Sequence, residues 1–397
     1  MKILQISGDW KWTGPAEPML LLLRALRERG HEVELVCPAA ATERERSLAG
    51  EARRVGVVPV HTLAPGRGIR PWRDTPDARW LRTWVEGEGI EIVHVWHSRD
   101  HALALRATSR RRRAGTASLV RSHPGASTIA ATPWNRWFFG PGCDGLLCVS
   151  PESARRNARL RGGRPVAGCL GTADPDRFPA LGPAPGSGAA ARAALGLGPD
   201  QLVIGIAARV QRHRRFDLLF EAMAELARQR PDARLLVMGR GTHFDELARR
   251  PVERLGLGDR VILAGHRSLD YPALLGSLDV FTLLVPGSDG TCRALLEASL
   301  CGVPSVATRR GPLPEIVLDG ETGLLVDERP ADLAAAWQRL LDDAPLRRKL
   351  GAAARSRAER LFVPDRFAAD VERFYASVLA APSSSARLSV ESETSSR

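Results

Sequence analysis

Residues 280–302, VFTLLVPGSDGTCRALLEASLCG, contain the pattern that decides the fold. The first six residues, 280–285, form an apolar run with the length of a buried strand. A loop with two glycines follows, and 293–301 then has the apolar spacing of a helix. Buried strands that lead through short loops into helices build parallel sheets with helices on both faces.

The same alternation extends along the chain in both directions. In the first half, strands are expected at 3–7, 33–37, 57–61, 92–96, 118–122, 146–149 and 165–169, and helices at 16–29, 77–88, 102–113 and 151–161. In the second half, strands are expected at 202–207, 234–238, 261–264, 280–285, 305–307 and 323–326, and helices at 189–195, 216–230, 244–255, 271–277, 293–301, 332–342, 345–361 and 364–379. This predicts an α/β fold with two doubly wound, Rossmann-like domains that face a cleft.

Changes in composition along the chain suggest five segments. They are an N-terminal domain (1–178), a linker rich in Pro, Gly and Ala (179–199), a C-terminal domain (200–361), a helix that crosses back to the first domain (362–380) and a disordered Ser-rich tail (381–397). In open α/β sheets, ligands bind beyond the carboxyl ends of the strands. The chemistry is therefore expected in the loops that follow strands.

Cysteine usage and the N-terminus indicate where the protein works. The six cysteines include no C-x-x-C pair and no histidines group around them, a reduced pattern that predicts no metal site. The N-terminus lacks the apolar core of a signal peptide, and no apolar run near it could cross a bilayer. We expect a cytoplasmic protein, with at most peripheral attachment to the inner face of the membrane.

The net charge of +12 is concentrated in the first half of the chain. Residues 1–178 contain 28 Lys and Arg against 18 Asp and Glu, whereas residues 179–397 contain 29 against 27. A bias toward arginine codons explains part of the surplus but not its position. A positive first half favours an anionic partner there.

The loop before 293–301 and that helix's first turns contain groups suited to a nucleotide sugar. Gly290 lets a ligand approach the backbone, and free N–H groups at a helix N-terminus suit phosphate. Asp289 and Glu297 can accept hydrogen bonds from sugar hydroxyls, and Arg293 adds positive charge. The alternative is structural: Asp289 caps the helix and Glu297 pairs with an arginine.

A second loop, after the strand at 202–207, is strongly basic. The stretch GIAARVQRHRRFD, residues 205–217, brings together Arg209, Arg212, Arg214 and Arg215. Clustered guanidinium groups at the carboxyl end of a strand suit a diphosphate. The alternative is a solvated basic loop.

The second half resembles the nucleotide-sugar-binding domain of the family 4 glycosyltransferases, which have the GT-B fold. In ARVQRHRRFDLL, residues 208–219, Arg209 matches the family's arginine, Arg214 falls on its lysine and Arg215 on its glycine. Further collinear matches are LLVMGRG (235–241), LGLGDRVILAG (255–265), Asp289-x7-Glu297 for the family's E-x7-E, EASLCGVPSVAT (297–308) and GPLPEIVLDGETGLLV (311–326).

The first half resembles the same family more loosely. Gly14-Pro15-Ala16-Glu17 keeps one glycine and the acid of the family's G-G-x-E, and His123 follows a strand, as the family's active-site histidine does. Other similar stretches are RGHEV (29–33), EIVH (91–94), CDGLLCVS (143–150) and GTADPDRF (171–178).

The resemblance implies a retaining, metal-independent transfer of a sugar from a nucleoside-diphosphate sugar, with no cofactor. It implies that Arg209 and Arg214 stabilise the leaving diphosphate and that Glu297 binds the ribose. Asp289 would hold the donor sugar, and His123 would lie near the transferred sugar. Gly14, Gly239, Gly241, Gly290, Thr291, Cys292 and Arg293 complete the expected donor-binding set.

Three departures from the family pattern concern this expected site. Asp289 is one methylene shorter than glutamate, Arg214 replaces a lysine and Arg215 replaces a glycine. A nucleotide-sugar epimerase of the same fold, or a protein that binds nucleotide sugar without catalysis, are alternatives. The donor sugar, its base, the acceptor and the oligomeric state do not follow from the sequence.

The basic first half is where this family binds its acceptor, so the resemblance points to an anionic one. Arg110–Arg113 form a run of four arginines, and tryptophans at 72, 80, 84, 134 and 137 lie among further arginines. Arginine and tryptophan together are typical of membrane interfaces, although most such rings are core residues. We expect a lipid-linked or cell-envelope glycan acceptor, such as one for lipopolysaccharide, and an anionic membrane surface. The sequence shows no nucleic-acid-binding motif.

Overall fold

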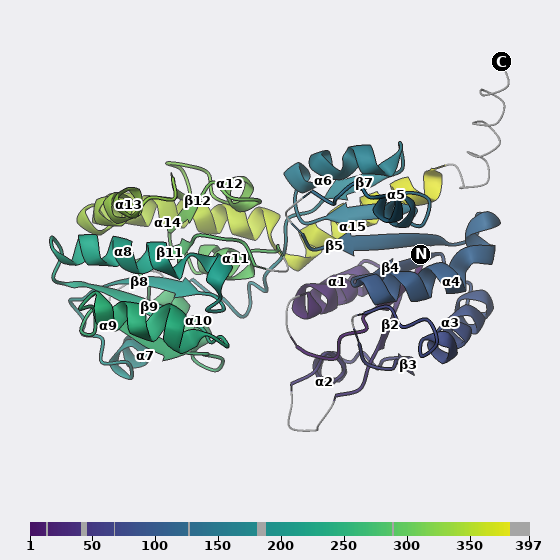
Figure 1. Cartoon of the computed structure of the whole chain (residues 1–397), viewed down its shortest axis with the longest axis horizontal. Helices are drawn as coiled ribbons and strands as arrows, with labels where there is room; N and C mark the ends of the chain where they lie inside the picture. The colour runs from purple at the N-terminus through teal and green to yellow at the C-terminus, as the bar shows by residue number, and fades with distance from the viewer. Residues whose placement is uncertain are drawn as a thin grey trace, which may run out of the picture. The chain divides into compact units, whose positions relative to one another are not determined.

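The computed structural model describes residues 1–12, 15–40, 46–66, 68–125, 128–180, 188–287 and 290–381. The chain forms two compact units, one of Met1–Leu170 with the chain from Pro364 onward and one of Gly171–Val363 (Figure 1). The first unit thus ends eight residues before the boundary suggested by composition. The carbonyl oxygen of Phe362 accepts hydrogen bonds from Thr172 Oγ1 (3.0 Å) and the Ala173 N–H (2.9 Å). These bonds hold residues 172 and 173, at the start of the second unit, against the end of the same unit.

The first unit contains a seven-stranded parallel sheet in the order β3-β2-β1-β4-β5-β6-β7. Its strands are β1 (Lys2–Ile6), β2 (Glu32–Cys37), β3 (His61–Thr62), β4 (Ile92–Val95), β5 (Ser118–His123), β6 (Gly145–Cys148) and β7 (Val166–Gly168). The strand order reverses between β1 and β4, which makes this pair the topological switch point.

Helices cover both faces of the first sheet. They are α1 (Ala16–Glu28), α2 (Leu48–Arg54), α3 (Thr75–Gly87), α4 (Ser98–Arg113), α5 (Pro133–Phe139), α6 (Pro151–Asn157) with the 3₁₀ turn η1 (Ala158–Arg161), and α15 (Pro364–Ala380). One face packs against α1, α2 and α15, and the other against α3 and α4. The last helix therefore returns to the first unit, as expected, and Tyr375 on it hydrogen-bonds His94 Nδ1 at 2.6 Å.

The second unit contains a six-stranded parallel sheet in the order β10-β9-β8-β11-β12-β13. The strands are β8 (Leu202–Ala207), β9 (Ala233–Met238), β10 (Val261–Gly265), β11 (Val280–Leu283), β12 (Ser305–Thr308) and β13 (Gly323–Val326). This is the doubly wound order with its switch point between β8 and β11. Both units thus confirm the α/β, Rossmann-like prediction.

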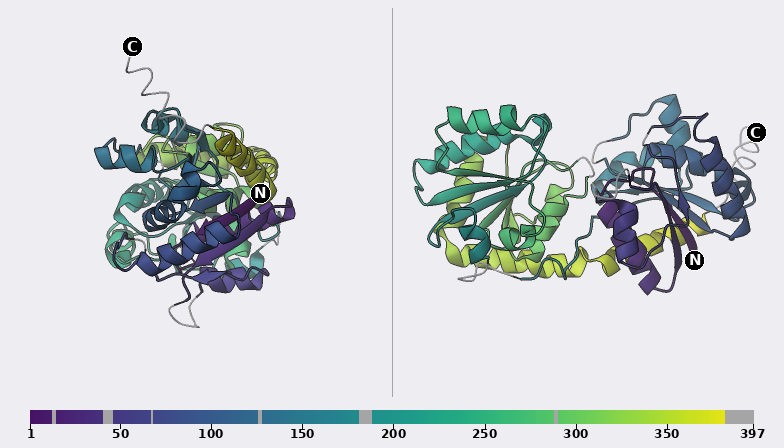
Figure 2. Two further views of the ribbon diagram at one scale, coloured as in Figure 1. Left: turned by 90° about the vertical axis from the view of Figure 1, so that its right-hand side faces the viewer. Right: turned by 90° about the horizontal axis from the view of Figure 1, so that it is seen from below.

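The second sheet also lies between two layers of helices (Figure 2). These are α7 (Ala189–Ala193), the 3₁₀ turn η2 (Arg212–Arg214), α8 (Phe216–Ala227), the π-helix η3 (Asp245–Arg249), α9 (Arg250–Arg254), α10 (Tyr271–Gly276), α11 (Arg293–Leu300), α12 (Leu313–Ile316), α13 (Pro330–Asp342) and α14 (Ala344–Leu361). Trp337 is fully buried at the core between α13 and the sheet, and its Nε1 donates to Thr282 Oγ1 at 2.8 Å.

Some local predictions were wrong for identifiable reasons. The strand expected at 57–61 is confined to His61–Thr62, because Val57 is buried against α2 without pairing to β2. The helix expected at 244–255 is a π-helix followed by a short α-helix, and Pro251, which has no N–H to donate, lies at the junction. The predicted tail from 382 onward and linker residues 181–187 lie outside the described residues.

Candidate functional site

The loops after β8 and β11 meet at the switch point of the second unit. The two strands are neighbours, with Val280 paired to Ile204 and Phe281 to Gly205. The basic stretch leads from β8 to α8, and the glycine-containing stretch leads from β11 to α11. In open α/β sheets this is where ligands bind, so we take these loops as the candidate site.

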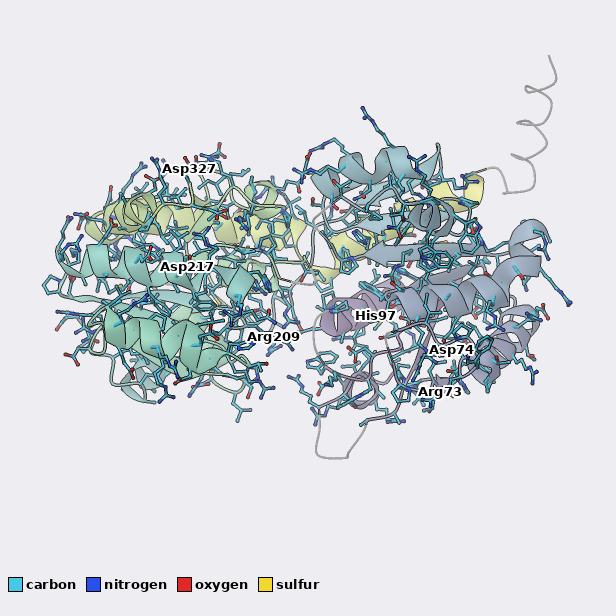
Figure 3. All side chains as sticks on the ribbon, in the orientation of Figure 1. Arg73, Asp74, His97, Arg209, Asp217 and Asp327 are labelled. Atoms are coloured by element: carbon cyan, nitrogen blue, oxygen red, sulfur yellow. The ribbon has the colours of Figure 1, made fainter. Side chains whose placement is uncertain are left out.

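Arg209 is carried on a loop that lies against the end of β9. The Ala208 N–H donates to the Met238 carbonyl (3.1 Å) and the Val210 N–H to the Arg240 carbonyl (3.2 Å), which continues the β8–β9 ladder past the sheet. The Arg209 guanidinium is exposed, and among the described residues it makes no hydrogen bond or ion pair (Figure 3). A cation held on a fixed backbone with a free head group is suited to bind an anion.

Gly239 and Gly241 lie directly under this loop. A Cβ on Gly239 would overlap the carbonyl oxygen of Ala208, and a Cβ on Gly241 would overlap that of Val210. The sequence predicted that both glycines contact the donor. The structure shows that the space of their missing side chains is filled by the protein's own backbone on either side of Arg209, and their contact with the donor stays a prediction.

The other arginines of this loop have separate partners. Arg214 is only 9% exposed, and its Nη1 donates to the Val285 carbonyl at 2.7 Å, which connects the loop after β8 to the end of β11. Arg215 contacts Glu328 and Asp217, and Arg212 pairs with Glu246 at 2.7 Å. The four guanidinium groups therefore do not form one cluster. Arg209 and Arg212 are both exposed, and of these two Arg209 makes no hydrogen bond or ion pair with the described residues.

Arg215 adopts a left-handed backbone conformation that favours glycine. Its φ is 58°, and only Cys292, with φ 50°, shares positive φ among the described non-glycine residues. Each of the two is the N-cap of a helix, Arg215 for α8 and Cys292 for α11. A left-handed residue other than glycine costs about 1–2 kcal/mol. Arg215 therefore adopts this conformation at an energetic cost.

The N-terminus of α11 combines a buried threonine hydroxyl with a left-handed turn. Thr291 is 8% exposed, and its Oγ1 has no hydrogen-bond partner in the described chain. Gly290 has φ 62°, a conformation that favours glycine, and it precedes the left-handed Cys292. Helix N-termini attract negative charge. Asp289, and likewise Gly14 of the first unit, lie outside the described residues.

Glu297 is held from two sides. It is 3% exposed, its Oε1 is 3.2 Å from Arg293 Nε, and its Oε2 accepts a hydrogen bond of 2.7 Å from the hydroxyl of Tyr271. The pairing with an arginine matches the structural alternative for this residue. Tyr271 was not predicted, because a single aromatic residue at the start of a short helix carries no functional signal in a sequence.

The candidate residue of the first unit is His123, the last residue of β5. Its ring is partly buried, makes an edge contact with Phe139 (6.0 Å between centroids) and lies against Gly125. At the neighbouring switch point, Asp100 accepts hydrogen bonds from the backbone N–H groups of Gly8 (2.7 Å) and His97 (3.1 Å). His123 therefore stands at the carboxyl edge of the first sheet, where its role was expected.

The arginine run 110–113 is not one uniform surface. Arg112 is 8% exposed and forms two hydrogen bonds with Asp144, at 2.6 and 2.8 Å. Arg111 donates to the carbonyl oxygens of Val85 and Thr116 at the ends of α3 and α4. Both side chains are bonded within the first unit, whereas Arg110 and Arg113 are exposed. The contact of this run with an acceptor or a membrane stays a prediction.

Among the described residues, no three or more His, Cys, Asp and Glu side chains group so as to hold a metal ion. Within the same part of the chain, no helix is both long and apolar enough to span a bilayer.

Comparison with known proteins identifies relatives for both units. Residues 15–166 match the model of Glycosyltransferase Family 4, and residues 189–357 match that of Glycosyl transferases group 1. The chain is 31% identical over 344 residues to the GDP-mannose-dependent alpha-(1-6)-phosphatidylinositol monomannoside mannosyltransferase of Mycolicibacterium smegmatis, an alignment that covers 82% of this chain and 85% of the relative.

Solved structures share the fold at lower identity. A glycosyltransferase from Rickettsia africae superposes with a TM-score of 0.80 at 16% identity, over 96% of this chain and 99% of that one. The HepE protein of Anabaena, solved in complex with UDP, gives a TM-score of 0.77 at 17% identity, over 95% and 100% of the two chains. These likenesses confirm the arrangement of two Rossmann-like domains.

Proposed function

The chain belongs to the family 4 glycosyltransferases, and we propose that it transfers a sugar, with retention of configuration, from a nucleoside-diphosphate sugar to a lipid-linked or cell-envelope glycan. The observation that carries this proposal is the exposed guanidinium of Arg209, which has no partner in the described part of the chain and lies on a braced loop at the β8/β11 switch point. The diphosphate leaving group develops negative charge as the glycosidic bond breaks. A fixed cation at that place lowers the energy of the transition state.

The other residues of the second unit would bind the donor. Arg214 adds positive charge from the buried side of the loop, and the N–H groups at the start of α11 face the negative phosphate or sugar. Glu297 would accept hydrogen bonds from the ribose hydroxyls, and Asp289 from those of the donor sugar. Because protein cations neutralise the diphosphate, the reaction would need neither metal nor cofactor.

The donor is tested with two candidates that the comparisons suggest. The mycobacterial relative uses GDP-mannose, and the Anabaena protein was solved with UDP. Purified chain is incubated with GDP-mannose or UDP-glucose and a phosphatidylinositol mannoside acceptor, and the product is analysed by NMR. A product with the donor's anomeric configuration supports retention, and an inverted product would refute it. Conversion of the donor into another nucleotide sugar without acceptor would instead indicate an epimerase.

Arg209→Ala tests the site directly. We expect a loss of about 10²–10³-fold in kcat with an unchanged fold, as for removal of one preorganised transition-state contact. Arg228→Ala is the matched control, since Arg228 is also exposed but lies at the far end of α8. Equal activity of the two variants would remove Arg209 from the mechanism.

We propose that the first unit, which would bind the acceptor, contacts the anionic surface of the membrane on its cytoplasmic face. Residues 101–150 contain seven arginines and one acidic residue. Within them, α5 exposes Trp134 (56%) and Trp137 (47%), while Phe138 and Phe139 on the same helix pack into the core. Exposed tryptophans beside arginines are suited to the headgroup region of a bilayer.

Vesicle flotation tests this surface. The wild-type chain should float with phosphatidylglycerol vesicles and much less with phosphatidylcholine vesicles. The double variant Trp134→Ser/Trp137→Ser should lose most of this binding, whereas Trp72→Ser, which removes a ring that is 89% exposed between β3 and α3, should keep it. Equal flotation of all three proteins would exclude α5 as the contact.

A further inference from the structure

We propose that Tyr271 is a positioning residue for donor binding: its hydroxyl fixes the Glu297 carboxylate in the orientation that binds the ribose. The inference rests on the proposed function, in which Glu297 binds the ribose of the nucleotide. The hydroxyl of Tyr271 donates to Glu297 Oε2 at 2.7 Å, across 26 residues of sequence and from a different helix. No pattern in the sequence assigns a role to this tyrosine.

Two contacts orient the Glu297 carboxylate, one on each oxygen. Arg293 Nε lies 3.2 Å from Oε1, and the Tyr271 hydroxyl donates to Oε2. A carboxylate oxygen can accept two hydrogen bonds, so an anchored oxygen can also accept from a ligand hydroxyl. With one anchor on each oxygen, rotation of the carboxylate is restricted. Two adjacent hydroxyls, such as those of a ribose, are the kind of group that such a fixed pair of oxygens recognises.

Tyr271 can act only as a donor in this contact. Burial raises the pKa of its hydroxyl well above the ordinary value, and the neighbouring Glu297 charge raises it further. The phenol therefore remains protonated at any physiological pH. A neutral donor stabilises the buried carboxylate without competing, as a second cation would, for the negative groups of the ligand.

The ring of Tyr271 is itself held in place. Phe178, which is 1% exposed, meets it edge-on with 5.9 Å between the ring centroids and an angle of 83°. Arg177 lies over the Phe178 ring at 5.3 Å. The hydroxyl is thus presented to Glu297 by a ring that packs against the core, which is the arrangement expected of a residue that positions another.

The test uses the chain's two tyrosines as a matched pair. Tyr271→Phe removes the hydroxyl and keeps the ring. Tyr375→Phe makes the same change at a buried tyrosine whose hydroxyl contacts His94 in the first unit. GDP and UDP are titrated calorimetrically into each protein, and the tighter nucleotide is then compared with its 2′,3′-dideoxy form.

Wild-type chain should bind the ribonucleotide more tightly than the dideoxy form. In Tyr271→Phe the ribonucleotide should bind about tenfold more weakly, as for a lost hydrogen bond to a charged group, with the dideoxy form nearly unchanged. Tyr375→Phe should match wild type for both ligands. Phe178→Leu loosens the Tyr271 ring but keeps its hydroxyl, so it should weaken binding of the ribonucleotide by a smaller factor. This variant provides an independent measurement if Tyr271→Phe misfolds.

The outcomes separate the inference from its premise. If wild-type chain does not distinguish the two nucleotides, the ribose role of Glu297 fails, and the inference fails with it. If wild-type chain distinguishes them and Tyr271→Phe does so equally well, only the inference is overturned. If Tyr271→Phe weakens binding of the ribonucleotide and of its dideoxy form by the same factor, the tyrosine has a general structural role. That result would also overturn the inference.

Discussion

Replacing Gly239 with alanine should impair catalysis without touching a ligand. The added Cβ would overlap the carbonyl oxygen of Ala208 and lie 3.0 Å from its carbonyl carbon. Both are backbone atoms, so no side chain can turn aside. The loop after β8 would have to move by about 1 Å, and Arg209 is the next residue. Misplacement of a transition-state contact by about 1 Å can cost about 10²-fold.

We therefore expect kcat/KM for sugar transfer to fall about 10²-fold in Gly239→Ala. Initial rates at subsaturating donor give this value, and circular dichroism checks the fold. Gly258→Ala is the matched control, because a Cβ at Gly258 meets no atom within 4 Å and its φ is ordinary. The reasoning is refuted if a folded Gly239→Ala protein transfers sugar within about twofold of the Gly258→Ala rate.

Three further predictions concern the stability of the first unit. It contains eight of the nine tryptophans, so its unfolding in urea can be followed by tryptophan fluorescence. Arg99→Met should lower the free energy of unfolding by about 3 kcal/mol, because it leaves the buried Asp74 and Asp77 carboxylates without their cation; a loss below 1 kcal/mol would contradict this. Arg112→Ala should cost more than Arg110→Ala, which should stay within about 0.5 kcal/mol of wild type, since only Arg112 is buried and paired. Burial lowers the pKa of His94 and of His101 to about 3, so the unfolded chain takes up protons first as the pH falls below about 6.5. Stability should then decrease between pH 6.5 and 3, by about 2 kcal/mol per histidine at pH 5, and a His94→Asn/His101→Asn variant should show a smaller decrease.

The sequence predicted the strands of the second unit and both loops of the site. The reason is physical: Val280–Leu283 and Leu202–Ala207 are continuous apolar runs, which a sheet buried on both faces requires. The loops that follow such strands must meet at the switch point, so the neighbourhood of Arg209 and α11 could be inferred from order along the chain alone.

The partners of individual side chains could not be inferred in the same way. Arg112 and Arg113 are neighbours in one arginine run, yet only Arg112 turns into the protein to meet Asp144, 32 residues later. Gly239 has the spacing of a ligand-binding glycine, but its space is filled by another segment of the chain. Such contacts depend on tertiary packing, which periodicity and spacing do not encode.

The contact between Tyr271 and Glu297 is a further example. The two residues lie on α10 and α11, and they approach because these two helices contact each other. The segment that enters the second unit brings Phe178 against Tyr271. A sequence shows the acid and its arginine, which are one helical turn apart, but not the tyrosine that completes the arrangement.

The most direct test of the account is the rate of sugar transfer from GDP-mannose and UDP-glucose by wild-type chain and by Arg209→Ala. We predict acceptor-dependent transfer from one of these donors, with release of the nucleoside diphosphate, and a loss of about 10²–10³-fold in the variant. Transfer that proceeds equally well without the Arg209 guanidinium would contradict it.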